Sequence, residues 1–141
     1  MIHLLDTDHI SLLERGGTEG AAIRNRMRRI PIDDIGTTII SYEEQMRGWL
    51  SRISRASTAD DQTKAYERLK RELQNYCDIP VVEYGTGAIR EFDRLKGLRV
   101  RIGTMDLKIA AIALANNATL LTRNLSDFNR VPDLRAEDWS L

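Results

Sequence analysis

The chain has 141 residues, of which 42% are hydrophobic, and its 21 basic side chains balance its 21 acidic ones. This length suits one domain with a buried core, and the composition excludes a disordered chain. Because the charges balance, net charge provides no general attraction for a polyanion. The single cysteine, Cys77, excludes an internal disulfide and a thiolate metal cluster. We therefore expect one ordered domain over residues 1–141.

The sequence does not predict a membrane segment. No apolar run approaches the roughly 20 residues that a membrane-spanning helix needs. Asp6 interrupts the first apolar run before it reaches the length of a secretory signal. We expect a cytoplasmic protein without a membrane partner.

Strand-like and helix-like segments alternate along the chain, since short apolar or β-branched runs predict strands and apolar periods of 3.6 residues predict helices. In chain order, we expect a strand at 2–5, a helix from 8 that stops at Gly16 and Gly17, a helix capped by Thr18 and ended by Pro31, a strand at 35–40, helices at about 42–52 and 58–77, a strand at 79–84, a helix at 86–97, a helix started by Thr104 and ended at Asn116 and Asn117, a strand at 118–122, and an edge strand within 134–141.

The two central helices are expected to form a helical hairpin. In the second of them, an apolar stripe predicts the buried face; it consists of Ala65, Leu69, Leu73 and Tyr76. Alternation of apolar strands with helices indicates an α/β layered structure around a parallel sheet.

Four acids fall where the carboxyl ends of the strands are expected, and ligands of open parallel sheets bind at that edge. Asp6 follows the first strand, and Glu44 lies one helical turn beyond the second. Asp106 lies in the first turn of the helix before the fourth strand, and Asp127 follows that strand. The sequence therefore predicts a cluster of carboxylates.

Two of these positions have structural alternatives. Asp8 is expected to be the N-cap of the first helix, which leaves Asp6 free for a functional role. Glu44 competes with a capping box, because Ser41 precedes it by three residues. For Asp127, an ordinary loop acid is the alternative.

Asp106 shares a helix face with apolar residues three, four and seven positions later, and an unpaired acid on such a face is costly unless it binds a cation. A cluster of carboxylates without thiols suits Mg²⁺ or Mn²⁺. Such ions promote attack of water on phosphodiesters.

The two histidines, His3 and His9, are expected to be structural. Several arginines, including Arg47 and Arg123, are candidates for phosphate contacts.

At this point the residues resemble a known family. The segments LLDTDHISLL, TTIISYEEQMRGW, IGTMDLKIAAIALANNATLLTRNLSDFNRVPDL and RAEDW are similar, in order and over nearly the whole chain, to PIN-domain ribonucleases of the VapC toxin type. The resemblance implies a PIN-like three-layer α/β/α fold with a central parallel sheet of four to five strands. It also implies Mg²⁺-dependent hydrolysis of RNA, a homodimer, and inhibition by a cognate VapB-type antitoxin.

The resemblance also assigns roles to particular residues. The family's metal ligands map to Asp6, Asp106 and Asp127, and its second acid, which follows a Ser or Thr by three, selects Glu44 over Glu43. Some members carry an aspartate where this chain has Asn124, so that side chain is expected to be a neutral ligand or to position water. The supporting residues are expected to be Ser41, Thr122 and Asn124, and the candidate substrate contacts are Arg47 and Arg123.

Two other functions remain open at the level of sequence. A strand that ends in Asp-x-Asp also opens haloacid-dehalogenase-like phosphatases, in which Asp6 would be the nucleophile, but the later lysine and paired acids of that family are missing. A PIN-like scaffold without catalysis is the other alternative. The presence of all four acids argues against it.

Overall fold

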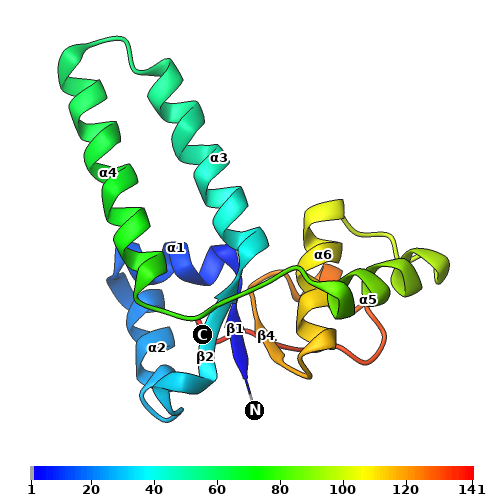
Figure 1. Ribbon diagram of the computed structural model, residues 1–141. Helices are drawn as coiled ribbons and strands as arrows, with labels where there is room; N and C mark the ends of the chain where they lie inside the picture. Colours follow the sequence, from blue (N-terminus) through cyan, green and yellow to red (C-terminus); the bar gives the residue numbers. More distant parts are fainter. Residues whose placement is uncertain (1) are drawn as a thin grey trace.

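The structure is a computed structural model that describes residues 2–141. The chain is built around a parallel sheet, which lies near the centre of Figure 1. The five strands run in the order β3-β2-β1-β4-β5. Their bounds are β1 (His3–Leu5), β2 (Ile35–Thr38), β3 (Val81–Val82), β4 (Thr119–Leu121) and β5 (Arg135–Glu137). Because every pairing is parallel, all five carboxyl ends lie at one edge of the sheet.

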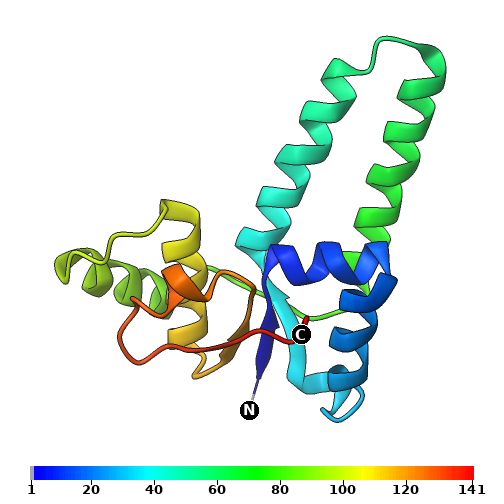
Figure 2. The ribbon, with the colours of Figure 1, turned by 180° about the vertical axis from the view of Figure 1, so that it is seen from behind.

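Helices cover both faces of the sheet. Their bounds are α1 (Thr7–Arg15), α2 (Gly17–Met27), α3 (Ile39–Arg55), α4 (Ala59–Cys77), α5 (Thr86–Gly97), α6 (Thr104–Ala115) and α7 (Leu125–Phe128), with a short 3₁₀ turn at Ile32–Asp34. Helices α5 and α6 lie on one side and α1 and α2 on the other, while α3 and α4 form a hairpin that extends beyond the sheet (Figures 1 and 2).

Alternation along the central strands creates two hydrophobic clusters. Leu4 and its strand partner Leu120 pack under α5 and α6, and Leu5 and its partner Leu121 pack under α1, α2 and α4. The α/β prediction with three layers and a central parallel sheet is therefore confirmed. None of the helices within residues 2–141 combines the length and apolar character of a membrane span.

Several predicted element boundaries were wrong by a few residues. The second strand ends at Thr38 rather than residue 40, because the Thr38 hydroxyl accepts from the Ser41 N–H and starts α3 there. The N-cap of α2 is Gly16 instead of Thr18. The N-cap of α6 is Gly103, and Thr104, the expected N-cap, is the first residue of the helix. The bounds of α4 agree with the predicted helix at about 58–77 to within one residue, and the bounds of α5 agree with the prediction.

The buried face of α4 also differs from the predicted stripe. Leu73 is 52% exposed, whereas its neighbour Glu72 is only 2% exposed. Tyr76, a member of the predicted stripe, is buried. A polar residue therefore occupies part of the face that α4 turns toward the rest of the molecule.

Candidate active site

Asp6 directly follows β1 and is the N-cap of α1. Its N–H continues the sheet by donating to the Leu121 carbonyl at 2.9 Å. Its carboxylate accepts from the Thr7 N–H at 2.8 Å and from the Thr122 hydroxyl at 2.9 Å. The prediction that Asp8 caps this helix was wrong, because the N-cap of α1 is Asp6, two residues before Asp8.

Burial dominates the electrostatics of Asp6, whose residue is only 6% exposed. The pKa of the Asp6 carboxyl is raised to about 7, mainly by loss of solvent and then by the charge of Asp8, while the bonds from Thr7 and Thr122 oppose the rise. A carboxylate in this position gains most from a cation beside it.

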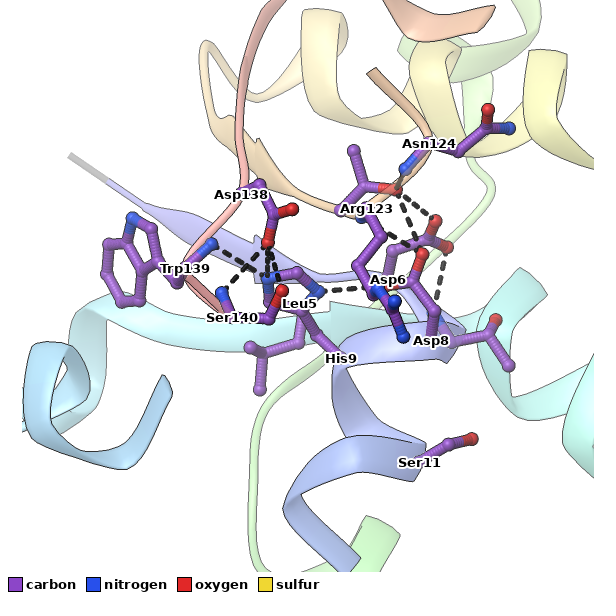
Figure 3. A network of polar contacts seen from close by, with 12 residues as sticks. Leu5, Asp6, Asp8, His9, Ser11, Arg123, Asn124, Asp138, Trp139 and Ser140 are labelled. Atoms are coloured by element: carbon purple, nitrogen blue, oxygen red, sulfur yellow. Dashed lines mark hydrogen bonds and ion pairs between the residues drawn. The ribbon is translucent and has the colours of Figure 1, made fainter. Parts of the chain in front are cut away.

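Asp8 lies beside Asp6 rather than outside the site (Figure 3). One of its carboxylate oxygens accepts from the Arg123 N–H at 3.0 Å and lies 3.3 Å from the Thr122 hydroxyl. The hydroxyl hydrogen of Thr122 thus faces two carboxylates. The sequence showed the close spacing of Asp6 and Asp8, but their shared contact with Thr122 depends on the neighbouring strand β4.

Glu44 reaches the same place from α3. One oxygen of its carboxylate accepts from the Thr7 hydroxyl at 3.2 Å, so Thr7 joins Glu44 to the N-cap of α1. The capping-box alternative is wrong, since the N-cap of α3 is Thr38 and Ser41 is its third helical residue. Burial raises the pKa of Glu44, the Thr7 bond lowers it, and the charge of Asp106 raises it again.

Asp106 stands in the first turn of α6, as predicted. Burial raises the pKa of its carboxyl, and the charges of Asp127 and then Asp8 raise it further. The three acids are therefore close enough to repel one another, although they come from α7, α1 and α6.

Asp127 occupies the rim of this cluster. It accepts from the Asn124 side-chain amide at 3.0 Å, and Arg130 lies 3.9 Å from its other oxygen. Asn124 in turn donates its backbone N–H to the Thr122 hydroxyl at 3.0 Å. The predicted supporting pair Thr122 and Asn124 thus connects Asp127 with Asp6.

These side chains surround an open groove of about 400 Å³ at the carboxyl edge of the sheet. Its lining consists of Asp6, Thr7, Asp8, Ser11, Leu12, Arg15, Glu44, Asp106, Arg123 and Asn124. Of the predicted residues, Asp127 adjoins the groove without lining it, and Ser41 is buried in the start of α3. Sequence reasoning missed Thr7, Asp8 and Arg15 as members of the groove.

The two candidate phosphate contacts differ in position. Arg123 lines the groove and forms an ion pair with Glu19 at 3.2 Å. Arg47 is 70% exposed and pairs with Glu43 on the same helix. Arg15, one of the missed residues, also lines the groove, so two arginines flank the acids.

The groove suits a hard cation by its chemistry. Within residues 2–141, no lysine or arginine lies within ion-pair distance of Asp6, Glu44 or Asp106. No three His, Cys, Asp or Glu side chains of this described part already form a metal cage. Mg²⁺ needs only one or two carboxylates and keeps several waters, so a preformed cage is not required.

The chain is similar to known proteins along its whole length. A family model of the PIN domain matches residues 4–134. Ribonuclease VapC1 of Haemophilus influenzae strain R2866 is 30% identical over 146 aligned residues, which cover 99% of each protein.

Solved structures show the same likeness. VapBC-1 from nontypeable Haemophilus influenzae has a TM-score of 0.71 and 27% identity, with 100% of both chains covered. VapBC2 from Rickettsia felis, bound to a DNA fragment from its promoter, has a TM-score of 0.73 at 23% identity, with 99% of both chains covered. The second likeness concerns the fold alone.

Proposed function

The chain belongs to the PIN-domain family, among its VapC-type ribonucleases, and we propose that it is a metal-dependent endoribonuclease, the toxin of a toxin–antitoxin pair. The observation that carries this proposal is the groove in which Asp6, Glu44 and Asp106 converge, with no lysine or arginine of residues 2–141 within ion-pair distance of them. Full-length similarity to a ribonuclease supports RNA as the substrate.

Mg²⁺ is the proposed cation, with Mn²⁺ as a substitute, because the available donors are carboxylate oxygens. Asp6 and Asp106 would hold it, with Asp127 next to Asp106 at the rim. When bound, such a cation lowers the pKa of a water molecule and neutralises phosphate oxygens.

The protein's own residues orient the reaction. Thr7 and Thr122 fix the two oxygens of Asp6, so its carboxylate is held before substrate arrives. Glu44 binds Thr7 through one oxygen, and its raised pKa suits the other oxygen for accepting a proton from the attacking water. Arg15 and Arg123 flank the groove, where they can contact the phosphates of RNA.

The phosphatase alternative finds no support in this geometry. Its nucleophile would be Asp6 and its proton donor Asp8, but Asp8 accepts from His9 and from the Arg123 N–H, so it is held as a hydrogen-bond acceptor. Family membership also favours the nuclease.

For partners, we propose a VapB-type antitoxin and a homodimer, in the cytoplasm where RNA is available. The similar structure from Haemophilus influenzae is a VapBC assembly. Copurification with the product of a neighbouring small gene and light scattering of the isolated chain would test the two partners separately.

The decisive experiment measures cleavage of RNA by the purified chain with Mg²⁺, with Mn²⁺ and with EDTA. We expect cleavage with either metal, and loss of cleavage in EDTA and in Asp6→Asn. Asp133→Asn, an exposed acid on the loop before β5, is the matched control and should keep activity. Full activity in EDTA or in Asp6→Asn would refute the proposed function.

A further inference from the structure

His9 is a fully buried side chain that lies next to the groove but outside its lining. Its Nδ1 lies 2.8 Å from Asp8, and its Nε2 lies 3.1 Å from the backbone nitrogen of Trp139 (Figure 3). Both ring nitrogens therefore have partners. The prediction of a satisfied structural histidine holds, but one of those partners is an acid of the groove.

The partners determine the tautomer of His9. A backbone N–H can only donate, so Nε2 of His9 must accept from Trp139 and carries no hydrogen. The hydrogen of the neutral ring is then on Nδ1, where it is donated to Asp8. The bond from Trp139 thus makes His9 a hydrogen-bond donor toward the groove.

The Trp139 N–H is held in place by the C-terminal segment after β5. Asp138 accepts from the Ser140 N–H at 2.8 Å and from its hydroxyl at 2.6 Å, which closes a tight turn around Trp139. The Trp139 residue is only 4% exposed, and its ring packs against His3 and Arg26. These contacts and the burial of Trp139 fix the position of its backbone N–H.

Asp8 needs such support because it stands beside another carboxylate. Its two oxygens receive donors from different segments, Nδ1 of His9 on one and the Arg123 N–H on the other. Without the bond from His9, the Asp8 side chain can turn away from Asp6. Asp8 then loses its contacts with Thr122 and Arg123. Those contacts tie Asp8 to the segment after β4, whose Arg123 and Asn124 line the groove.

We propose that His9 is a positioning residue of this nuclease: it is oriented by the Trp139 N–H and holds Asp8 beside Asp6 through its Nδ1–H. The inference rests on the proposed function and adds to it a connection between the C-terminal turn and the acids. Asp8 shares the Thr122 hydroxyl with Asp6, a proposed metal ligand, and outer hydrogen-bonding groups of metal sites typically contribute 10- to 100-fold to activity or metal affinity.

Two substitutions separate the two bonds of His9. In His9→Asn, the amide nitrogen of the new side chain occupies roughly the place of Nδ1 and keeps the donor to Asp8. In His9→Gln, the longer side chain reaches the place of Nε2 and keeps only the acceptor for Trp139. Each variant removes one buried ring, so both should lose similar thermal stability. His3→Phe, at the other histidine, is the matched control, because the buried Nδ1 of His3 has no hydrogen-bond partner among residues 2–141.

We expect His9→Gln to lower kcat by about 10- to 100-fold with little change in KM, and His9→Asn to recover most of that loss. Mn²⁺ affinity, measured by calorimetry, should follow the same order. In a double-mutant cycle, His9→Gln should add little to Asp8→Asn, because both act through one contact. Equal losses in the two His9 variants, or additive effects with Asp8→Asn, would overturn the proposal.

A spectroscopic measurement tests the inference even if a variant does not fold. In ¹⁵N-labelled wild-type protein, the His9 resonances, assigned with His3→Phe, should report a hydrogen on Nδ1 and none on Nε2. The opposite tautomer would refute the positioning role. This readout does not depend on RNA cleavage, so inactivity of the wild-type chain would count against the proposed function alone.

Discussion

The acidic groove and the base of the α3–α4 hairpin each contain a carboxyl group whose pKa is raised to about 7. The two regions differ in the groups that surround this carboxyl. In the groove this group is Asp6, and at the hairpin it is Glu14 of α1, which meets Glu72 of α4. Burial is the largest cause of the raised pKa in both.

At the hairpin, protein groups satisfy the acids. A hydrogen bond between the Glu14 and Glu72 carboxyls favours a shared proton, and Asn75 donates to Glu14 at 3.5 Å. With its amide nitrogen turned toward Glu72, Gln45 donates to both oxygens of that carboxyl, at 2.6 and 3.0 Å, and accepts from Ser11. This pair holds α4 against α1 and α3 without an added cation.

In the groove, Asp6 and Glu44 come from separate elements, and their carboxylates accept from the Thr7 N–H and from the hydroxyls of Thr7 and Thr122. They line a groove of about 400 Å³. Glu14 and Glu72 also line a cavity, of about 270 Å³, but they share it with Arg52 and Arg68. The contrast teaches that a raised pKa alone does not identify an active site. The deciding feature is whether amides and a shared proton already satisfy the carboxyl, or whether a cation and a phosphate can still reach it.

The largest expected difference between the two regions is in catalysis. Asp106→Asn should lower kcat/KM for RNA by about 1000-fold, because a metal contributes several kcal/mol of charge stabilisation. Glu72→Gln keeps the shape of its side chain and should retain activity. Comparable losses of activity in these two variants would contradict the separation of the regions.

Metal affinity should depend on pH through the groove. The cation binds carboxylates, so protons compete with it below the raised pKa of Asp6, about 7. Between pH 7 and 6 we expect Mn²⁺ affinity, measured by calorimetry, to fall several-fold, toward about tenfold per pH unit. Glu14→Gln is the control and should show the same pH dependence. Affinity that is constant over this range would argue against Asp6 as a ligand.

The smallest expected effect is on stability at the hairpin. Because the folded-state pKa of Glu14 is raised from 4.5 to about 7, the folded chain keeps a proton that the unfolded chain releases. Its contribution to stability is complete below about pH 4.5 and is lost as the pH rises through about 7.

Glu14→Gln carries no charge at any pH, so the free energy of unfolding should fall less steeply between pH 5 and 8 than in the wild type. Urea unfolding in EDTA measures this slope, and part of it should remain because Asp6 shifts in the same direction. Glu67→Gln, on the exposed side of α4, should leave the slope unchanged. An unaltered slope in Glu14→Gln would contradict the shared proton.

Much of the fold followed from local pattern. Helix α5 spans the predicted residues 86–97, and α4 spans nearly the predicted 58–77, because apolar periodicity acts within a few positions of the chain. The four acids could be predicted as a group for a related reason. In a parallel sheet the carboxyl ends meet at one edge, so acids that follow strands come together.

The errors arose where long-range contacts decided between neighbours. Which of Asp6 and Asp8 caps α1 depends on where β1 stops, and that is fixed by the bond from Asp6 to Leu121 on β4. Likewise, α4 buries Glu72 instead of Leu73 because Gln45 and Glu14, from other helices, offer it partners.

By itself, the sequence determined the alternation of strands and helices and the residues able to bind a hard cation, since both depend on side-chain type and spacing. Only the tertiary structure decided which donor meets which carboxylate: His9 and Arg123 donate to Asp8, and Asn124 donates to Asp127. Hydrogen bonds depend on ångström distances between segments as far apart as residues 9 and 139, and periodicity carries no information on those distances.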